Sequence, residues 1–324
     1  MNSNDDDRTR AASAPTRFSW RDYKAVLLRT WKEASADNVG LMAAGVAFYC
    51  FLALVPLLAA TILTYGLVVD IETVREHLTR LLMVLPSDVG PLVTDQIANV
   101  VRTSEGKKGL GLLIALAIAL FGARNAAGSI VSALNIAYEE EERRSFVKVN
   151  ILALAITMGA VVTAILAAIG VGAMRFMPDA LPAAGGLVLV LGRLVTYALL
   201  GLAAATGAAL LYRYGPARDH PKWRWLTPGS IFFALGWIAL TIGFGIYVSR
   251  FGSYGATYGS LSAVVVLLTW IYLSAYVLLF GAELNSELEH QTSRDTTTGP
   301  EEPMGERGAW AADHVASDEA SAPA

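Results

Sequence analysis

The chain has 324 residues, of which 54% are apolar and only 16% are charged, and its mean hydropathy is +0.47. A soluble domain carries about 25% charged residues, so this composition indicates a protein with a lipid-facing surface. The net charge of −3 without a strongly basic cluster argues against a nucleic-acid partner, and the single cysteine, Cys50, excludes an intramolecular disulfide and a cysteine-based metal site.

The first predicted elements are a polar tail and a helix that lies in the membrane interface. Residues 1–16 are acidic and lack an apolar core, so we predict a disordered cytoplasmic tail and no cleaved signal peptide. Residues 17–39 follow, with four apolar positions on one helical face among basic side chains: Trp20, Tyr23, Leu27 and Trp31 beside Arg21, Lys24, Arg29 and Lys32. Aromatic anchors flanked by basic residues are typical of a helix on an anionic membrane surface.

Six apolar segments are long enough to cross a bilayer, which requires about 20 residues. Within a membrane domain of residues 40–289 they lie near 41–69, 109–133, 149–174, 185–212, 228–250 and 259–282. Backbone amides in lipid find partners only in helices and closed barrels, and these runs lack the alternation of barrel strands. We therefore predict an all-α, polytopic membrane bundle with about six transmembrane helices.

Two polar segments complete the predicted organisation. Residues 70–108 contain two short amphipathic stretches separated at Pro86, and they are too polar to span, so we predict an external hairpin. Residues 290–324 are rich in Thr, Gly, Pro, Glu, Ser and Ala without periodicity, which predicts a second disordered cytoplasmic tail.

The distribution of Lys and Arg predicts the orientation in the membrane. One side carries the basic residues that precede the first span and those of 143–148 and 213–224, whereas the two short loops of the other side hold only Arg175 and Arg250. Because short cytoplasmic loops are enriched in Lys and Arg, we predict a bacterial inner-membrane protein with both termini in the cytoplasm.

Three segments resemble the YihY/BrkB family of membrane proteins. They are residues 228–289, GVAFYCFLALVPLLAA at 45–60 preceded by TWKE at 30–33, and RNAAGSIVSALNIAY at 124–138. The resemblance covers about residues 20–290 and implies a six-helix inner-membrane protein without a settled activity. The family's old label, ribonuclease BN, is regarded as misassigned, and members are linked to serum resistance and to envelope-lipid export.

Arg124 is the most informative candidate site residue. It lies about 22 Å along the second predicted span by helical rise, and Asn125 follows it. An arginine inside the membrane costs roughly 2.5–3.5 kcal/mol on insertion scales, so we expect it to face the bundle interior or a wet cavity and to have a partner. The alternative is that Arg124 snorkels to the cytoplasmic headgroups.

Four further residues are candidates for a substrate pathway. Glu283 and Asn285 end the last span at a depth where Glu283 can pair with Arg124, although Glu283 can equally begin a solvated helix. Arg193 either forms a basic ring with Arg175 and Arg250 or snorkels separately. Pro56 interrupts the first span and predicts a kink, which either borders a binding site or is simply tolerated.

These features favour a transporter or flippase-like protein that acts on an anionic lipid or amphiphile. A non-transporting scaffold with envelope-protein partners is the alternative, and a membrane-associated ribonuclease ranks last. The four histidines show no catalytic or metal-ligand spacing, so we expect no enzyme, cofactor, metal or nucleic-acid partner. Membrane lipids are the expected partners, and small-residue seams permit a homo-oligomer without requiring one.

Overall fold

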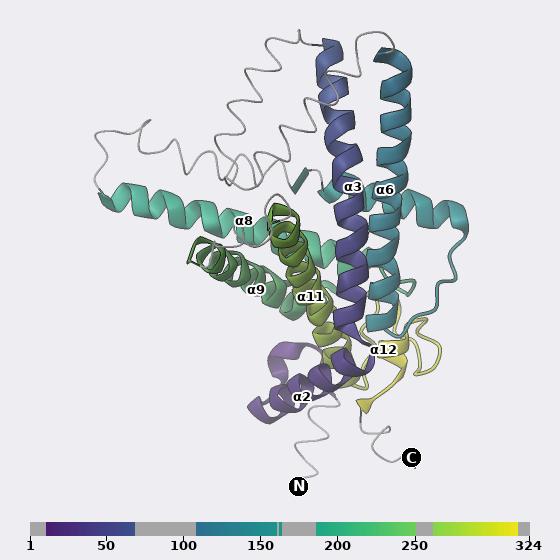
Figure 1. Ribbon diagram of the computed structural model, residues 1–324. Helices are drawn as coiled ribbons and strands as arrows, with labels where there is room; N and C mark the ends of the chain where they lie inside the picture. The colour runs from purple at the N-terminus through teal and green to yellow at the C-terminus, as the bar shows by residue number, and fades with distance from the viewer. Residues whose placement is uncertain (1–10, 69–107, 161, 164–185, 251–261, 317–324) are drawn as a thin grey trace.

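The computed structural model describes residues 11–68, 108–160, 162–163, 186–250 and 262–316, which are drawn as coloured ribbon in Figure 1. The regular secondary structure within these ranges is helical, apart from an isolated antiparallel bridge between Pro221 and Thr297. The elements are η1 (Pro15–Arg17), α2 (Trp20–Ala36), α3 (Val39–Val68), α6 (Lys108–Ala137), the helix Phe146–Ala160, α8 (Gly186–Tyr214), α9 (Trp223–Arg250), α11 (Ser262–His290) and α12 (Trp310–Asp313). This confirms the predicted all-α class.

Several helices have the length and composition needed to cross a membrane. In the described residues these are Gly186–Tyr214, Trp223–Val248 and Val264–His290, and α2 with Val39–Leu54 forms a further pair bent by 62°. The predicted hairpin at 70–108 lies outside the described residues except for Lys108, and so does all of 164–185. The count of six spans therefore stays a prediction.

The helices gather at one end of the molecule, here called the basal end, which carries α2 and α12. Figure 1 shows α3 and α6 side by side and antiparallel, with α8 and α9 inclined to them. Gly122 on α6 allows the close approach of this pair, since a Cβ added there would lie 3.1 Å from the Cα of Ala53. α11 packs against α9, α3 and α2 and so connects the two groups of helices.

The buried core lies in the basal half, whereas the flanks expose large apolar side chains. Its fully or nearly fully buried members come from α3, α6 and the turn that follows it, α8, α9 and α11: Val39, Ala43, Val46, Ala133, Leu134, Ala137, Tyr138, Ala208, Tyr212, Leu226, Leu279 and Ala282. Small residues let neighbouring membrane helices approach closely. Along α8, by contrast, Leu191, Leu194 and Leu202 are exposed. Such extensive apolar exposure is typical of a surface that contacts lipid.

α2 has the amphipathic character that its sequence predicts, with one difference. The side chain of Ser19 accepts a hydrogen bond from the amide of Asp22 (3.3 Å), and the carboxylate of Asp22 accepts one from the amide of Ser19 (2.7 Å), so a capping box fixes the first turn. Trp20 and Trp31 are exposed, at 80% and 65%. Tyr23 does not share this face, because its hydroxyl donates to the carbonyl oxygen of Pro15 at 2.9 Å.

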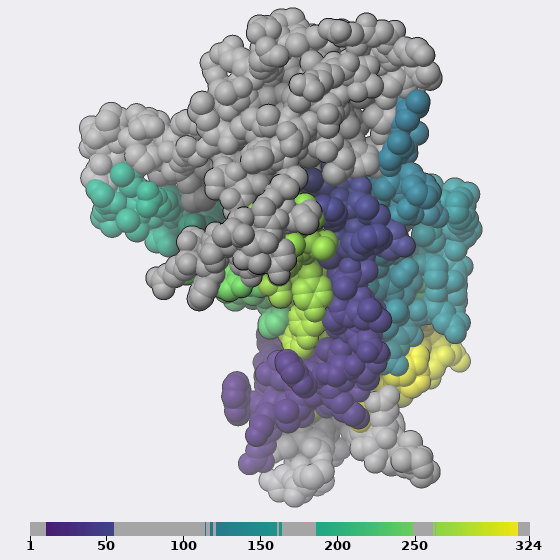
Figure 2. All heavy atoms as spheres, viewed as in Figure 1, coloured from purple at the N-terminus to yellow at the C-terminus, as the bar shows by residue number. Residues whose placement is uncertain are grey.

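The prediction that the chain beyond residue 290 is disordered is wrong for residues 291–316. This segment packs on the basal end, and Figure 2 shows its yellow atoms against the lower part of α6. Polar contacts hold it in place: the amide of Lys222 donates to the carbonyl oxygen of Thr296 (2.8 Å), and the amide of Thr298 to that of His220 (2.8 Å). The residues that make these contacts show no apolar periodicity in the sequence, which explains why composition alone suggested disorder.

The predicted disorder of residues 1–16 is likewise wrong for the part that the structure describes, residues 11–16. Pro15 and Ala12 are buried, and the hydroxyl of Thr292 donates to the carbonyl oxygen of Ala12 at 2.7 Å. The two ends of the described chain therefore stabilise each other beneath α11.

Hydrogen exchange should distinguish this folded segment from a disordered tail. Two backbone hydrogen bonds join the segment to residues 220–222: the amide of Thr298 donates to His220, and the amide of Lys222 donates to Thr296. Residues 299–301, by contrast, are exposed. We expect peptides that cover 292–298 to exchange at least about tenfold more slowly than random coil, because a protected amide exchanges only when its hydrogen bond opens. Random-coil exchange over 292–298 would contradict the packed arrangement.

Candidate functional site

Arg124 lies on the outer surface of α6, beside the first turn of the helix Phe146–Ala160. Its Nε donates a hydrogen bond to Oδ1 of Asn150 at 2.6 Å, and its Nη1 donates to Oδ1 of Asn125 at 3.3 Å. The guanidinium carbon lies 5.3 Å from the centre of the Phe146 ring. The site therefore combines one cation, two amides and one aromatic face.

The local sequence of the helix Phe146–Ala160 positions the amide of Asn150. Its Nδ2 donates to the carbonyl oxygen of Phe146 at 2.8 Å, one helical turn earlier. This bond commits the NH₂ group to the backbone, so the oxygen of the same amide faces Arg124. Phe146 thereby supports the site twice, through its carbonyl group and through its ring.

The charge of Arg124 has no acidic counterpart in the described part of the chain. The ion pairs found there join other residues, and the printed partners of Arg124 are neutral amides. Large apolar side chains are exposed around it on both helices: Ile118, Phe121, Phe146, Val147 and Ile151. A guanidinium has five N–H donors, so groups remain that can bind an anion.

Arg124 is exposed rather than directed into the bundle interior. Its described partners are Asn150 and Asn125, so of the alternatives that the sequence left open, the structure does not form the pair with Glu283. The reason is the packing of α11, whose Glu283 is buried beside Asp37 at the junction of α2 and α3. Asn125 contacts Arg124, with its amide oxygen as the acceptor.

Asn285 connects α9 and α11 and is fully buried. Its Oδ1 accepts from the amide of Gly229 at 2.8 Å, and its Nδ2 donates to the carbonyl oxygen of Leu226 at 3.3 Å. Between these two positions lies Pro228, which has no N–H and interrupts the backbone bonding of α9. Asn285 thus supplies hydrogen bonds at the proline and holds the two helices together.

Arg193 and Pro56 are not brought to this site by any described contact. Arg193 is exposed on α8. A basic ring with Arg175 and Arg250 is untested, because Arg175 and the side chain of Arg250 lie outside the described residues. α3 continues as a helix through Pro56, and the surroundings of that side chain also lie outside the description.

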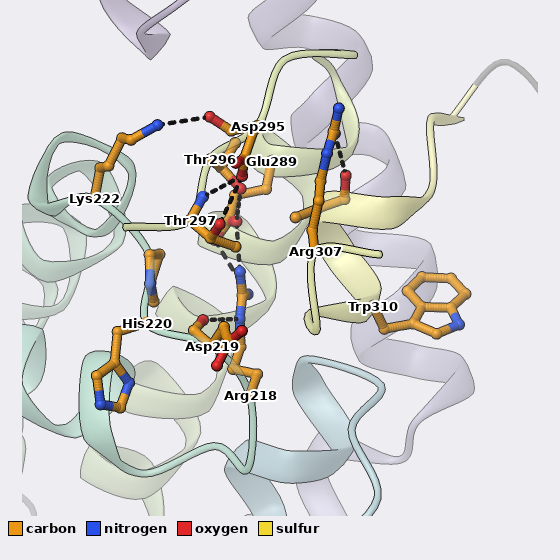
Figure 3. A network of polar contacts seen from close by, with 12 residues as sticks. Arg218, Asp219, His220, Lys222, Glu289, Asp295, Thr296, Thr297, Arg307 and Trp310 are labelled. Carbon is orange, nitrogen blue, oxygen red and sulfur yellow. Dashed lines mark hydrogen bonds and ion pairs between the residues drawn. The ribbon is translucent and has the colours of Figure 1, made fainter. Parts of the chain in front are cut away.

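A buried ion pair at the basal end was missed by the sequence analysis. Arg218 donates to Glu289 through Nη2 at 2.7 Å and through Nη1 at 3.2 Å, and both side chains are 0% exposed (Figure 3). The hydroxyl of Thr296 donates to the same carboxylate at 2.6 Å, and the Arg218 guanidinium lies 5.2 Å from the Tyr138 ring centre. In the sequence Arg218 is one of several loop cations, and nothing local marks Glu289 as its partner.

Asp295 organises the segment that covers this ion pair. Its Oδ1 accepts from the amide and the hydroxyl of Thr297 at 2.8 and 2.7 Å, and its Oδ2 accepts from the amide of Glu302 at 3.2 Å. Burial raises the pKa of Asp295, but these hydrogen bonds outweigh it and hold the pKa below its usual value. Lys222 donates to the carbonyl oxygen of Asp295 at 2.9 Å, which fastens the segment to the loop before α9 (Figure 3).

The loop after α6 is anchored to the end of α8 by a second, more exposed pair. Arg144 bonds Glu142 through Nε at 2.8 Å and Nη2 at 2.6 Å, and donates to the carbonyl oxygens of Tyr214 and Gly215. The hydrogen bond from Arg144 lowers the pKa of Glu142 to about 2. These contacts fix the loop that leads into the helix Phe146–Ala160, and this helix carries Asn150 and Phe146 of the Arg124 site.

Comparison with known proteins places this architecture in a family. The family model described as virulence factor BrkB matches residues 30–305. The ribonuclease-like protein YfkH of Bacillus subtilis is 32% identical over 191 residues, which cover 58% of this chain and 69% of the relative. A UPF0761 membrane protein of Pseudoalteromonas translucida is 25% identical over 269 residues, which cover 80% and 84% of the two chains.

Some relatives are longer than this chain. A UPF0761 membrane protein of Rhodospirillum centenum is 29% identical over 279 residues, and this chain covers 58% of its length. No solved structure matches the chain significantly. The matched region 30–305 contains both Arg124 and the basal ion pair of Arg218 with Glu289. With its apolar helices and a family match over most of its length, the chain is a membrane protein that belongs to the BrkB virulence factor family.

Proposed function

We propose that this protein binds an anionic lipid or amphiphile at Arg124 and moves it across the membrane as a transporter or flippase-like protein. The observation that carries the proposal is the environment of Arg124. It is an exposed cation on an apolar flank, with neutral hydrogen-bond partners and no carboxylate within ion-pair distance among the described residues.

Electrostatics favours an anionic ligand at this position. An arginine in a membrane span costs roughly 2.5–3.5 kcal/mol, and natural proteins usually offset such a cost with a partner. Asn150 and Asn125 hold the guanidinium in place without neutralising it. A phosphate or carboxylate headgroup can accept two N–H groups from one arginine, while the surrounding apolar side chains contact the acyl chains.

The basal end supports contact with an anionic membrane surface. The outer face of α2 exposes Trp20, Leu28 and Trp31 together with Lys24. Tryptophans and lysines in this pattern are typical of interfacial helices on anionic leaflets. The excess of Lys and Arg in the basal loops supports a cytoplasmic location for this end and an inner-membrane location for the protein.

Lipid translocation in reconstituted vesicles tests the proposal. The probes are fluorescent short-chain phosphatidylglycerol, which is anionic, and the matching phosphatidylcholine, which is zwitterionic. We expect the wild type to move the anionic probe faster, and Arg124→Leu to lose roughly tenfold or more of that rate, because a charge-assisted hydrogen bond is worth about 1.5–3 kcal/mol. Arg193→Leu is the matched control, since it removes an exposed arginine from another apolar helix.

Two results would contradict the proposal. Equal rates in the wild type, Arg124→Leu and protein-free vesicles would show that the protein does not translocate these lipids. That result, together with stable co-purifying envelope proteins, would favour a non-transporting scaffold. An equal loss of translocation rate in Arg124→Leu and Arg193→Leu would show that exposed arginines on the apolar flank contribute alike. That result would contradict a specific role of Arg124.

A further inference from the structure

Two acidic side chains meet where α11 passes the junction of α2 and α3. α2 ends at Ala36 and α3 begins at Val39, and the two helices are bent by 62° at this break. Asp37 lies in the break, and its side chain is close enough to Glu283 of α11 for the two carboxyl groups to interact. Glu283 is only 2% exposed, whereas Asp37 is half-buried.

One oxygen of the buried Glu283 carboxyl group, Oε1, lacks a hydrogen-bond donor in the described part of the protein. This oxygen is inaccessible to solvent, and none of the described N–H or O–H groups donates to it. Two carboxylates offer only acceptor oxygens, so a hydrogen bond between them requires a proton on one of the two. If both carboxyl groups were ionised, the two negative charges would also repel each other in this largely buried place.

The charged groups around Glu283 and Asp37 do not replace the proton that a hydrogen bond between the two carboxyl groups requires. Glu33 on α2, Glu287 on α11 and the hydroxyl of Tyr138, which follows α6, interact electrostatically with Glu283. Ionised carboxylates nearby would add negative charge. The nearby basic side chains contact another acid, Glu287. Arg29 donates to Glu287 at 2.6 Å, and His290 lies 3.6 Å from the same carboxylate.

We infer that Glu283 and Asp37 together bind one proton and form a protonation site that joins α11 to the junction of α2 and α3. A metal ion is not supported as the occupant, since the described residues contain no group of three or more His, Cys, Asp or Glu that could hold one. Burial raises the pKa of Asp37, the half-buried member through which the proton exchanges with water.

Loss of the proton places two like charges at a packed contact and drives α11 away from α2. The site thus links proton concentration to the position of a membrane-length helix, which is the element that a proton-coupled transporter needs. The inference concerns proton binding alone and does not depend on lipid handling at Arg124, because the two sites lie on different helices and are measured separately.

Infrared difference spectroscopy of the full-length protein in lipid vesicles tests the site directly. A protonated carboxyl group has a C=O stretching band that a carboxylate lacks. We expect such a band near neutral pH, its loss at alkaline pH, and its absence in both Glu283→Gln and Asp37→Asn. Glu287→Gln is the matched control, because Glu287 is paired with Arg29, and it should retain the band.

The outcomes separate the proton site from its alternatives. Each amide variant keeps a hydrogen-bonding group of similar size, and size-exclusion chromatography verifies that it is folded. No protonated-carboxyl band in the folded wild type, or a band that both variants retain, would overturn the inference. Removal of the band by sodium at constant pH would show that a cation occupies the position instead, and would overturn it as well.

Discussion

Arg218→Leu is expected to lower the free energy of unfolding by roughly 3–5 kcal/mol, because it leaves the carboxylate of Glu289 buried without its cation. Both side chains are 0% exposed and are joined at 2.7 Å. The hydroxyl of Thr296 donates to the same carboxylate, but one neutral donor does not replace a guanidinium. Equilibrium unfolding in a mild detergent measures the change.

The double variant Arg218→Leu/Glu289→Leu is the control for this prediction. Replacing both members of a buried ion pair by apolar residues is often close to neutral, so the double variant should be more stable than Arg218→Leu alone. A single-variant cost below about 1 kcal/mol, the range of exposed pairs, would contradict the burial of this pair. If the double variant lost the sum of the two single-variant changes in the free energy of unfolding, the packing around each side chain would matter more than the charge.

Gly229→Ala is expected to destabilise the contact between α9 and α11 by about 3 kcal/mol, at the upper end of the range for overpacked sites. A Cβ at position 229 would overlap the carbonyl oxygen of Gly281 and lie 2.6 Å from Cγ of Asn285. The first of these is backbone, which cannot rotate away. The added methyl group would also separate the amide of Gly229 from Oδ1 of Asn285.

Gly243→Ala provides a matched control on the same helix. No atom lies within 4 Å of a Cβ built at Gly243 in the described structure, so alanine fits without displacing anything. Because alanine has the higher helix propensity, we expect this variant to be neutral or slightly more stable in the same unfolding measurement. Similar losses in Gly229→Ala and Gly243→Ala would contradict the close approach of the two helices.

Hydropathy predicted the membrane helices well where the apolar run and the helix coincide. The predicted spans 185–212 and 109–133 agree with α8 and α6 to within a few residues. α11, predicted to leave the membrane at residue 282, continues as a helix to His290. The reason is tertiary: Glu287 and Glu289 are buried against Arg29 and Arg218, which lie far away in the sequence.

The candidate site was predicted in part for a similar reason. The sequence identifies Arg124 and Asn125 as polar residues in an apolar run, but that run is apolar on all sides, so no stripe marks which face is outward. Asn150 lies 26 residues later, and only the folded loop between the helices brings it to Arg124. The packed segment 291–316 shows the same limit, because the residues that hold it in place are polar and follow no helical or strand periodicity.

Native mass spectrometry of the protein extracted gently with its membrane lipids tests the Arg124 site most directly. We compare the wild type with Arg124→Leu and with the control Arg193→Leu, and identify the bound lipids by fragmentation. The wild type and the control are expected to retain an anionic lipid that Arg124→Leu loses. Identical lipids at identical occupancy on all three proteins would contradict an anionic-headgroup site at Arg124.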